Sequence, residues 1–324
     1  MEVKLVKQIN ELGAFKKEWN NLLEQNEVKE IFLTYEWIKT WLDIFYKNRE
    51  IFFLFVKEKE KIIGIAPLVI YKDGKKRSLG FVGRRGSDYN DFIIPSNKKE
   101  ILPVILDYII LNKDKFDLVE LINIPHYSST SEIFRTYSEK NHIKLNISIK
   151  NLCLTHLINK KSNLRFNKKK IRKARNSLSK LGTLSFECLY DIWHIKKHLP
   201  NFFSQHIKRK GAKSIFLQRI WKMFIEKLID SLPLNSILFS VVKLDNKPIA
   251  YHCGFIYNNK LIWYLPTFNI NYEKYSPGLI LLREVYNFVS KGDIKEIDFT
   301  VGEESYKKRF SNKVGKNLEI KFFP

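Results

Sequence analysis

Residues 237–300 carry the pattern that most restricts the fold of this chain. Three apolar runs with the alternation of strands follow one another: Ile237–Leu244, Pro248–Tyr257 and Leu261–Thr267. Short turns rich in Asn and Asp join them, which is typical of neighbouring antiparallel strands. A helix that begins at Pro277-Gly278 and a last strand at Glu296–Thr300 come next. This order predicts a mixed, mostly antiparallel sheet flanked by helices.

The length of the chain favours two such domains. It has 324 residues, of which 44% are hydrophobic and 14% aromatic, enough for two packed cores. In the first half, Thr34 can cap a helix that runs to about Tyr46, and Lys61–Tyr71 reads as one strand. We therefore expect an N-terminal domain over residues 1–155 and a C-terminal domain over residues 156–324.

Charge separates the two halves of the chain. Residues 1–150 carry 25 basic and 21 acidic side chains, a net +4, and the rest carries 32 and 13, a net +19. A field of this strength favours an anionic partner for the second half, such as a phosphorylated small molecule, a nucleic acid or an anionic membrane surface. No apolar run approaches the roughly 18 residues of a spanning helix, and no signal peptide is recognisable. These features predict a cytoplasmic protein, with a peripheral position at the inner membrane face compatible with the charge.

Three cysteines, Cys153, Cys188 and Cys253, lie far apart and without the spacing of metal ligands. We expect reduced structural thiols and no metal cofactor.

A first candidate site is the helix start Tyr275-Ser276-Pro277-Gly278. Free backbone N–H groups and the positive end of the helix dipole suit a pyrophosphate at such a position. The alternative is an ordinary capped helix start.

A second candidate site follows the last strand. Asp298, Glu303, Tyr306 and Lys307 lie within ten residues of one another. Carboxylates and a tyrosine at a strand end can exchange protons with an amine or a thiolate. Solvated charges in a loop are the competing interpretation.

Two further segments contain groups that could act on a substrate. His206 stands between the aromatic Phe202-Phe203 and the basic Lys208-Arg209-Lys210, and it is the group best suited to titrate near neutral pH. In the first half, the loop from Gly86 to Phe92 presents Asp88, Tyr89 and Asp91, which could hold a sugar or an amine. Each segment could equally be structural.

The fifth segment is strongly basic. Residues 160–182 contain ten Lys or Arg and no acid, among them Arg165 and Lys169, and Asn163–Leu181 predicts a single helix. Like charges repel one another, so the run is best explained by a nearby anion, such as RNA, lipid headgroups or a diphosphate.

Taken together and in this order, these motifs resemble the CelD-like acetyltransferases of the GNAT superfamily, which are related to the Fem peptidyltransferases. The resemblance rests on the following elements: Gly86–Phe92, Arg165–Gly182, Phe203 with His206, Gly211 and Phe216, Pro248-Ile249-Ala250, Tyr275–Gly278, and Asp298-Phe299 with Gly302, Tyr306 and Lys307. It implies two GNAT-like domains in tandem and transfer of an acyl group, expected to be acetyl, from acyl-CoA to an amine. The acceptor would be an amino sugar or a nucleotide- or lipid-linked sugar in bacterial polysaccharide biosynthesis.

On this basis we hypothesise the following roles for individual residues. Ser276, Pro277 and Gly278 would hold the pyrophosphate of acyl-CoA, and backbone N–H groups near Leu265 and Thr267 would bind the thioester carbonyl. His206 or Glu303 would be the base, Tyr306 the acid, and Asp298 would orient either one. The acceptor would contact the remaining candidates: Asp88, Tyr89, Asp91, Arg165, Lys169 and Lys307.

Two other functions remain open at this point. One is a Fem-like transferase that uses aminoacyl-tRNA, although residues 191–230 predict only two short helices where Fem enzymes carry a long helical arm. The other is a basic protein that binds nucleic acid or a membrane surface on a degenerate GNAT fold. Neither the sequence nor the resemblance implies an obligate protein partner.

Overall fold

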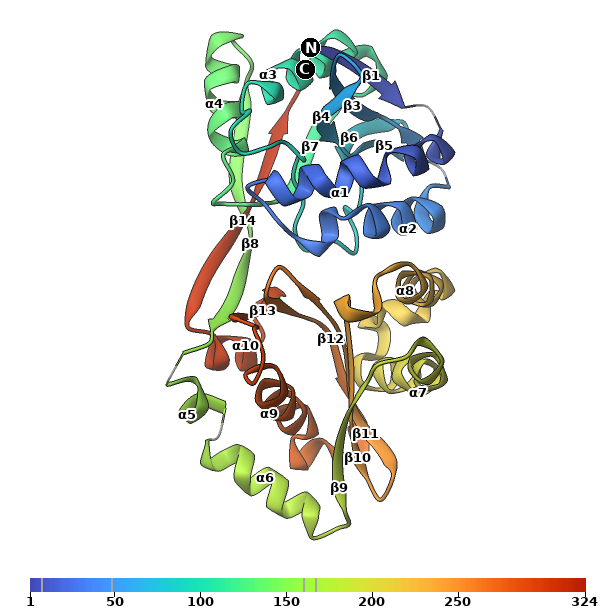
Figure 1. Cartoon of the computed structure of the whole chain (residues 1–324), viewed down its shortest axis with the longest axis vertical. Helices are drawn as coiled ribbons and strands as arrows, with labels where there is room; N and C mark the ends of the chain where they lie inside the picture. Colours follow the sequence, from blue (N-terminus) through green and yellow to red (C-terminus); the bar gives the residue numbers. More distant parts are fainter. Residues whose placement is uncertain (7, 48, 160, 167) are drawn as a thin grey trace. The chain divides into compact units, whose positions relative to one another are not determined.

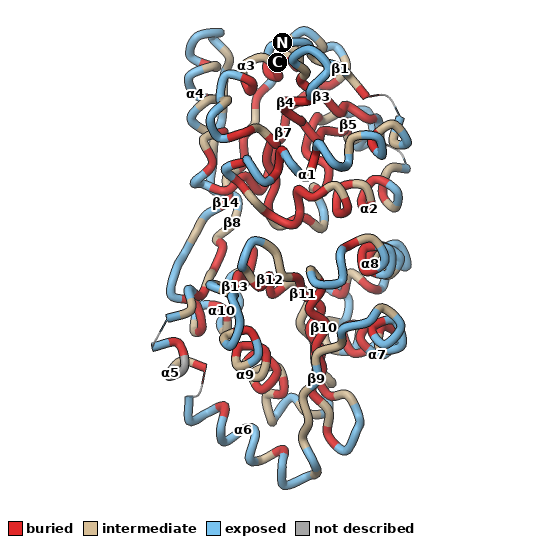
Figure 2. The backbone as a smooth tube through the Cα atoms, in the orientation of Figure 1, coloured by how far each residue is buried: buried red, intermediate tan, exposed pale blue. Residues whose placement is uncertain are grey.

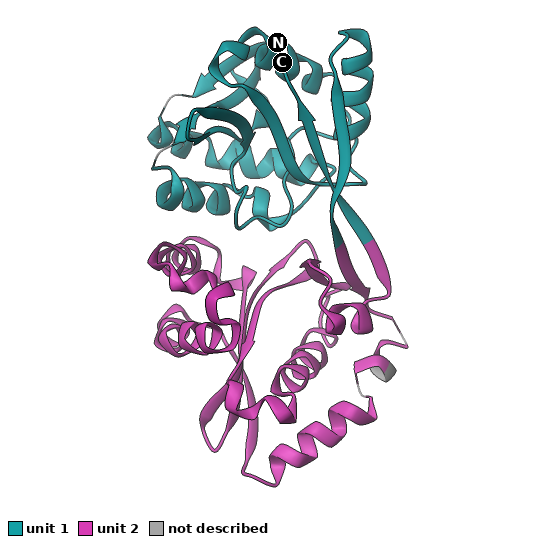
Figure 3. Cartoon of the chain, turned by 180° about the vertical axis from the view of Figure 1, so that it is seen from behind, with its two compact units in different colours: residues 1–152, 315–324 teal, residues 153–314 magenta. Residues whose placement is uncertain are grey.

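The computed structural model describes residues 1–6, 8–47, 49–159, 161–166 and 168–324. The chain divides into two compact units (Figure 3). The first comprises Met1–Leu152 and Gly315–Pro324, and the second comprises Cys153–Val314. The sequence-based boundary lay between residues 155 and 156, and the C-terminal segment 315–324 was placed with the second half. In the structure that segment belongs to the first unit.

The first unit is built from both helices and strands (Figure 1). Its elements in chain order are β1 (Glu2–Val6), α1 (Lys16–Gln25), α2 (Tyr35–Phe45), β2 (Arg49–Ile51), β3 (Phe53–Glu58), β4 (Lys61–Ala66), β5 (Leu68–Asp73), β6 (Lys76–Phe81), α3 (Ile101–Leu111), β7 (Leu118–Pro125), α4 (Thr130–Lys140) and β8 (Leu145–Leu157), whose last residues belong to the second unit.

The second unit continues with α5 (Ser162–Phe166), α6 (Lys169–Ser179), β9 (Leu184–Leu189), α7 (Ile192–Lys210), α8 (Arg219–Ser231), β10 (Ile237–Leu244), β11 (Lys247–Tyr257), β12 (Lys260–Phe268), the 3-10 helix η7 (Ile270–Tyr275), α9 (Pro277–Val289), β13 (Glu296–Val301), α10 (Ser305–Phe310) and β14 (Lys313–Phe322). Helices α7 and α8 cover one face of its sheet and α9 the other (Figure 1). The α/β class, with mostly antiparallel sheets flanked by helices, is confirmed.

The same motif occurs in both units. In the first, β5 and β6 are antiparallel, α3 follows, and β7 lies parallel to β6. In the second, β11 and β12 are antiparallel, α9 follows, and β13 lies parallel to β12. The structure therefore contains an internal repeat.

The final strand of each repeat pairs within the other unit. Strand β8 follows β7 and α4 in the chain, yet its end pairs with β13, with Thr155 opposite Asp298. Strand β14 follows β13 and α10, yet it pairs with β7, with Ile320 opposite Leu121. This exchange explains why residues 315–324 belong to the first unit.

Local sequence accounts for most of the individual elements. Asp245, Asn246, Asn258 and Asn259 all have positive φ, between 47° and 63°, as the two-residue turns of antiparallel hairpins require. The Oγ1 atom of Thr34 accepts a hydrogen bond from the backbone N–H of Trp37 and caps α2 as predicted.

Two predicted elements are divided in the structure. The expected strand Lys61–Tyr71 is two strands, β4 and β5, on either side of Pro67, and they pair in different sheets. The expected helix Asn163–Leu181 is two helices, α5 and α6, because the backbone of Lys168 is extended, with ψ of 148°. Residues 160 and 167 of the basic run lie outside the described residues.

Each unit has its own apolar core (Figure 2). In the second unit the buried rings of Phe166 and Tyr286 stack at 4.1 Å and attach α5 to α9. Within the part of the chain that the structure describes, no helix is long and apolar enough to cross a membrane.

Candidate active site

A pocket of about 250 Å³ opens in the second unit at the carboxyl end of β12. The pocket is lined by residues from β12, η7 and α10, from the starts of α6 and α9, and from the last turn of α7. They are Lys170, Arg209, Trp263, Pro266, Thr267, Phe268, Glu273, Ser276, Gly278, Leu279, Tyr306 and Arg309.

Divergence of two parallel strands exposes the β12 side of this pocket. Strand β13 pairs with β12 from Lys260 to Ile262, whereas β12 continues to Phe268. On the other side, β12 stays paired with β11 and contains an irregularity opposite Cys253 and Phe255. Among the described residues, β12 therefore has no strand partner on this side beyond Ile262, and such an edge can offer backbone groups to an extended ligand.

Three cations line the pocket. Lys170 is exposed at the start of α6, and Arg309 is half-buried on α10. The guanidinium of Arg209 lies 4.5 Å from the ring centre of Phe268 and donates from Nη1 to the carbonyl of Pro266 at 2.9 Å. With one carboxylate, Glu273, among the described lining residues, the pocket has a net positive charge.

The N-terminus of α9 forms another part of the wall. Ser276 adopts a left-handed conformation, with φ of 53°, and turns the chain into the helix at Pro277. Gly278 brings the helix close to Phe268, because a Cβ at this position would lie 3.2 Å from the Cδ1 atom of Phe268. Both Ser276 and Gly278 line the pocket, so the positive end of the helix dipole adds to the three cations.

Neutral hydrogen-bond donors also belong to the residues that line the pocket. The side chains of Trp263 and Thr267 are each 1% exposed, and neither the indole N–H nor the Thr267 hydroxyl has a hydrogen-bond partner among the described residues. Tyr306 lies beside Trp263, although their contact does not meet hydrogen-bond geometry. Burial raises the pKa of the Tyr306 hydroxyl, and the charge of Glu304 raises it further, so this hydroxyl keeps its proton at neutral pH.

The predicted site residues divide into two groups. The structure brings Thr267, Ser276, Gly278 and Tyr306 together at the pocket. Pro277 is buried in the first turn of α9, and Leu265 pairs with Cys253 on β11. The predicted coenzyme segment and the predicted acid therefore share one cavity.

His206, predicted as a base, is not among the residues that line this pocket. It is buried in α7, its Nδ1 atom lies 2.7 Å from the hydroxyl of Ser214, and its ring packs against Phe216. Burial lowers the pKa of His206 to about 4, and the charges of Arg209 and Lys210 act in the same direction. At neutral pH it is a neutral, packed side chain.

The candidate groups within and after β13 have structural partners. Asp298 is buried and accepts a hydrogen bond from the backbone N–H of Thr300 at 2.7 Å. Glu303 is exposed and forms an ion pair with Lys308. Lys307 is buried: its ammonium donates to the carbonyl of Val301 at 2.6 Å and pairs with Glu304 at 3.0 Å, which fixes the turn between β13 and α10. None of these three residues lines the pocket described above.

Of the predicted basic residues, Arg165 has a structural partner. Its guanidinium donates to the carbonyls of Arg309 and Ser311 at the end of α10, at 3.1 and 2.6 Å. A cation there is favourable because the last carbonyls of a helix are negative. Lys169 is exposed, and its neighbour Lys170 is the lysine that lines the pocket.

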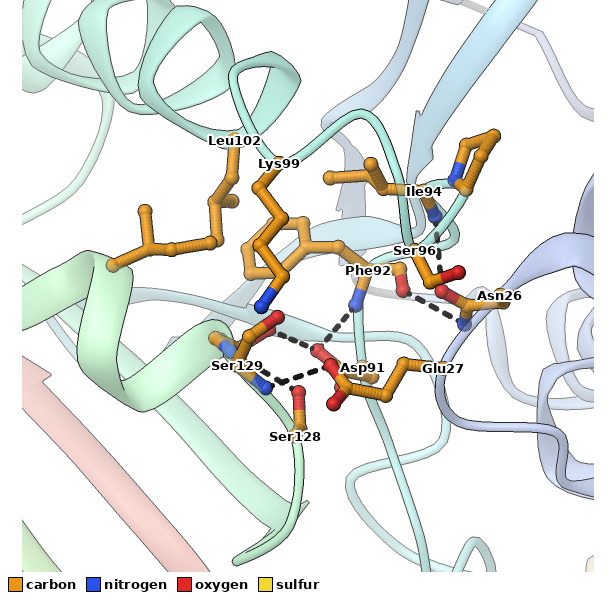
Figure 4. A pocket seen from close by; sticks show the side chains of 13 residues that line it. Asn26, Glu27, Asp91, Phe92, Ile94, Ser96, Lys99, Leu102, Ser128 and Ser129 are labelled. Carbon is orange, nitrogen blue, oxygen red and sulfur yellow. Dashed lines mark hydrogen bonds between the residues drawn. The ribbon is translucent and has the colours of Figure 1, made fainter.

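In the first unit, Asp91 is buried beside the start of α4 (Figure 4). Its carboxylate accepts hydrogen bonds from the backbone N–H of Phe92 at 2.8 Å and from the Thr130 hydroxyl at 2.6 Å. The cavity next to it measures about 20 Å³, room for one water and not for a sugar. Tyr89 is buried against Phe32, and the backbone carbonyl of Asp88 accepts from Asn317. Asp91 thus has a structural position in the first unit, and the predicted acceptor contact stays a prediction.

The burial of Asp91 predicts an unusual dependence of stability on pH. Burial raises its pKa from 3.8 to about 6, against the hydrogen bonds it accepts. Because protonation therefore favours the folded state, wild type should lose stability relative to Asp91→Asn, by up to about 3 kcal/mol, as the pH rises from 4 to 7. Urea unfolding of both proteins at several pH values measures the difference.

The exposed Asp114→Asn is the matched control for loss of one negative charge. A difference between wild type and Asp91→Asn that stays constant from pH 4 to 7 would contradict this description of Asp91.

Several lining residues were not predicted as site residues. Arg209 stands one turn after His206 on α7, and its place in the basic segment Lys208-Arg209-Lys210 could have indicated a site residue. Trp263, Phe268, Glu273 and Arg309 gave no such signal, because their meeting depends on where β12, η7 and α10 lie in the folded unit.

Comparison with known proteins agrees with this geometry. Residues 165–308, which contain every lining residue except Arg309, match the family model of the acetyltransferase (GNAT) domain. The fold is two GNAT-like domains in tandem. Among curated proteins the chain has no match.

Solved structures resemble the whole chain at low sequence identity. FemX matches with a TM-score of 0.67 and 12% identity over 98% of this chain and 97% of FemX. L-PGS from Bacillus licheniformis matches with a TM-score of 0.56 and 10% sequence identity, over 94% of this chain and 90% of L-PGS. A tandem GNAT protein from the clavulanic acid biosynthesis pathway matches with a TM-score of 0.53 and 7% sequence identity, over 98% of each chain. At these identities the likeness concerns the fold.

Proposed function

We propose that this protein is an acyltransferase that moves an acyl group from acyl-CoA to an amine, with the β12–α9–α10 pocket as its donor site. The observation that carries the proposal is the arrangement of charge in that pocket. Three cations and a helix N-terminus line the pocket together with two buried neutral donors, Trp263 and Thr267. A carrier with phosphates at one end and a neutral thioester at the other matches both sets of groups.

The phosphates of the carrier would bind at the start of α9. The backbone N–H of Gly278 is free of a helical partner, as at any helix start, and Lys170, Arg209 and Arg309 are near enough to line the same cavity. The extended arm of the carrier would then follow the free edge of β12 toward Tyr306.

The transfer itself requires two proton movements. The nitrogen of the acceptor attacks the thioester carbon, the C–N bond forms, and the C–S bond breaks. We assign the proton lost by the amine to Glu273, the carboxylate among the described lining residues. Tyr306, which holds its proton, donates to the departing sulfur. This assignment replaces His206 and Glu303 as the expected base.

A second donor class, aminoacyl-tRNA, is supported by a separate observation. The pocket residue Lys170 lies in the first turn of helix α6, and Lys169, Arg172, Lys173 and Lys180 are also exposed along or just beyond this helix. Within the described residues, Arg175 of this helix forms an ion pair with Glu284, at 3.7 Å. A long polyanion could extend from the pocket along this face.

Thermal unfolding with each donor separates these functions. Acetyl-CoA or CoA at a hundred times its dissociation constant should stabilise the protein by about 2.7 kcal/mol. No stabilisation by either compound, together with binding of aminoacyl-tRNA that weakens steeply between 50 and 200 mM salt, would favour the second donor. The salt concentrations are about those over which phosphate contacts are lost. Binding only to vesicles of anionic lipid would contradict both.

A further inference from the structure

Two buried donors in the pocket have no partner, and their positions along β12 differ. Trp263 stands one residue beyond the last pair of β12 with β13, next to Tyr306. Thr267 is four residues further along, next to Phe268, which contacts the start of α9. A strand rises about 3.3 Å per residue, so their backbones are separated by roughly 13 Å. The two donors cannot serve the same atom of a ligand.

The indole of Trp263 is held firmly in its position. Its ring stacks on the buried ring of His252 at 4.0 Å and 15°. Burial lowers the pKa of His252 to about 3, so His252 is neutral and the stack carries no charge at neutral pH. A rigid, desolvated donor has a larger effect on developing charge than one that must reorganise.

We propose that the indole N–H of Trp263 donates a hydrogen bond to the carbonyl oxygen of the transferred acyl group and stabilises the oxyanion formed when the amine attacks. The proposal rests on the proposed function. The thioester oxygen and sulfur are bonded to the same carbon, so donors to the two atoms must lie side by side. Tyr306 and Trp263 are such a pair: the hydroxyl serves the sulfur and the indole serves the oxygen.

The structure also gives an energetic reason for this role. Without a ligand the Trp263 N–H is buried with no partner among the described residues, a state that costs free energy. When acyl-CoA is bound, its carbonyl oxygen would accept a hydrogen bond from this N–H. The oxyanion would accept a stronger one, because charge-assisted hydrogen bonds are stronger than neutral ones. Thr267, near the α9 end, is positioned to bind an amide of the carrier arm in ground state and transition state alike.

The test compares Trp263→Phe with Thr267→Val in infrared spectra of bound acetyl-CoA labelled with carbon-13 at the thioester carbonyl. In wild type the carbonyl band should lie at lower frequency than in water, because a hydrogen bond weakens the C=O bond. Trp263→Phe should shift the band to higher frequency and leave the dissociation constant of CoA within about twofold. Thr267→Val should keep the low-frequency band and weaken CoA binding. No acceptor is needed for this measurement.

Other outcomes have defined meanings. A band unchanged in Trp263→Phe, with CoA still bound, would overturn the role of Trp263 and leave the backbone near Leu265–Thr267 as the carbonyl donor, with the proposed function intact. Failure of wild type to bind any thioester would overturn the acyl-CoA donor and this inference with it. With an amine acceptor present, Trp263→Phe should also lower the turnover of acetyl-CoA about a hundredfold or more at saturation, and unchanged turnover would count against the proposal. Loss of CoA binding by Trp263→Phe with a normal thermal unfolding curve would likewise contradict it.

Discussion

Gly278→Glu is expected to raise the dissociation constant for CoA by at least about a hundredfold. A side chain at position 278 must start 3.2 Å from Phe268 and extend into the pocket, where its carboxylate would lie among Lys170, Arg209 and Arg309. It would take up hydrogen bonds that phosphates otherwise receive. Two lost charged hydrogen bonds at about 1.5–3 kcal/mol each correspond to a hundredfold or more. Titration calorimetry with CoA measures the effect.

Folding of this variant should be preserved. An acidic residue in the first turn of a helix interacts favourably with the dipole, and the left-handed residue at this turn is Ser276, not Gly278. Gly292→Glu is the matched control, since it adds the same group just beyond the other end of α9, at an exposed glycine with no close neighbour for a new side chain. Equal CoA affinity in Gly278→Glu and Gly292→Glu would show that the start of α9 does not bind the donor.

Tyr306→Phe is expected to lower the turnover of acetyl-CoA about a hundredfold while leaving CoA affinity nearly unchanged. The raised pKa of Tyr306 keeps the hydroxyl protonated, so that it can donate to the sulfur as the C–S bond breaks. Loss of a positioned general acid costs typically a factor of 10² to 10⁴. The assay follows release of free CoA in the presence of a panel of amino sugars and polyamines.

Tyr286→Phe provides the comparison for Tyr306→Phe. Tyr286 is also a buried tyrosine of the second unit, but it packs against Phe166 and does not line the pocket. We expect wild-type turnover from this control. If Tyr306→Phe turned over acetyl-CoA as fast as Tyr286→Phe, the acid would have to be another group.

The core of the second unit was predictable because its signals are local. Strands β10 to β13 and helix α9 were expected within one residue of their observed ends. Alternating apolar residues, Asn and Asp in two-residue turns, and Pro at a helix start each act over a few residues. The expected coenzyme segment at Ser276–Gly278 and the acid Tyr306 follow from these elements, and both line the pocket.

Charged residues were harder to interpret. The sequence presents Arg165 and Lys307 as available cations, but the fold gives each a partner: the carbonyl groups at the end of α10 for Arg165, and Val301 and Glu304 for Lys307. Similarly, Asp91 is buried beside the hydroxyl of Thr130, and His206 is buried beside the hydroxyl of Ser214. The partner of a charge is set by contacts that no local pattern contains.

By itself, the sequence determined the type and order of most elements, the division of charge between the halves, and the position of the helix start at Pro277. These depend on side-chain periodicity, turn chemistry and composition, which act along the chain. Only the tertiary structure decided that β8 and β14 exchange places between the repeats, that Pro67 divides one apolar run between two sheets, and that Trp263, Arg209 and Arg309 meet Tyr306 at one pocket. Strand pairing and pocket formation bring together residues far apart in sequence, and their energy comes from burial and hydrogen bonds that exist only once the chain has folded.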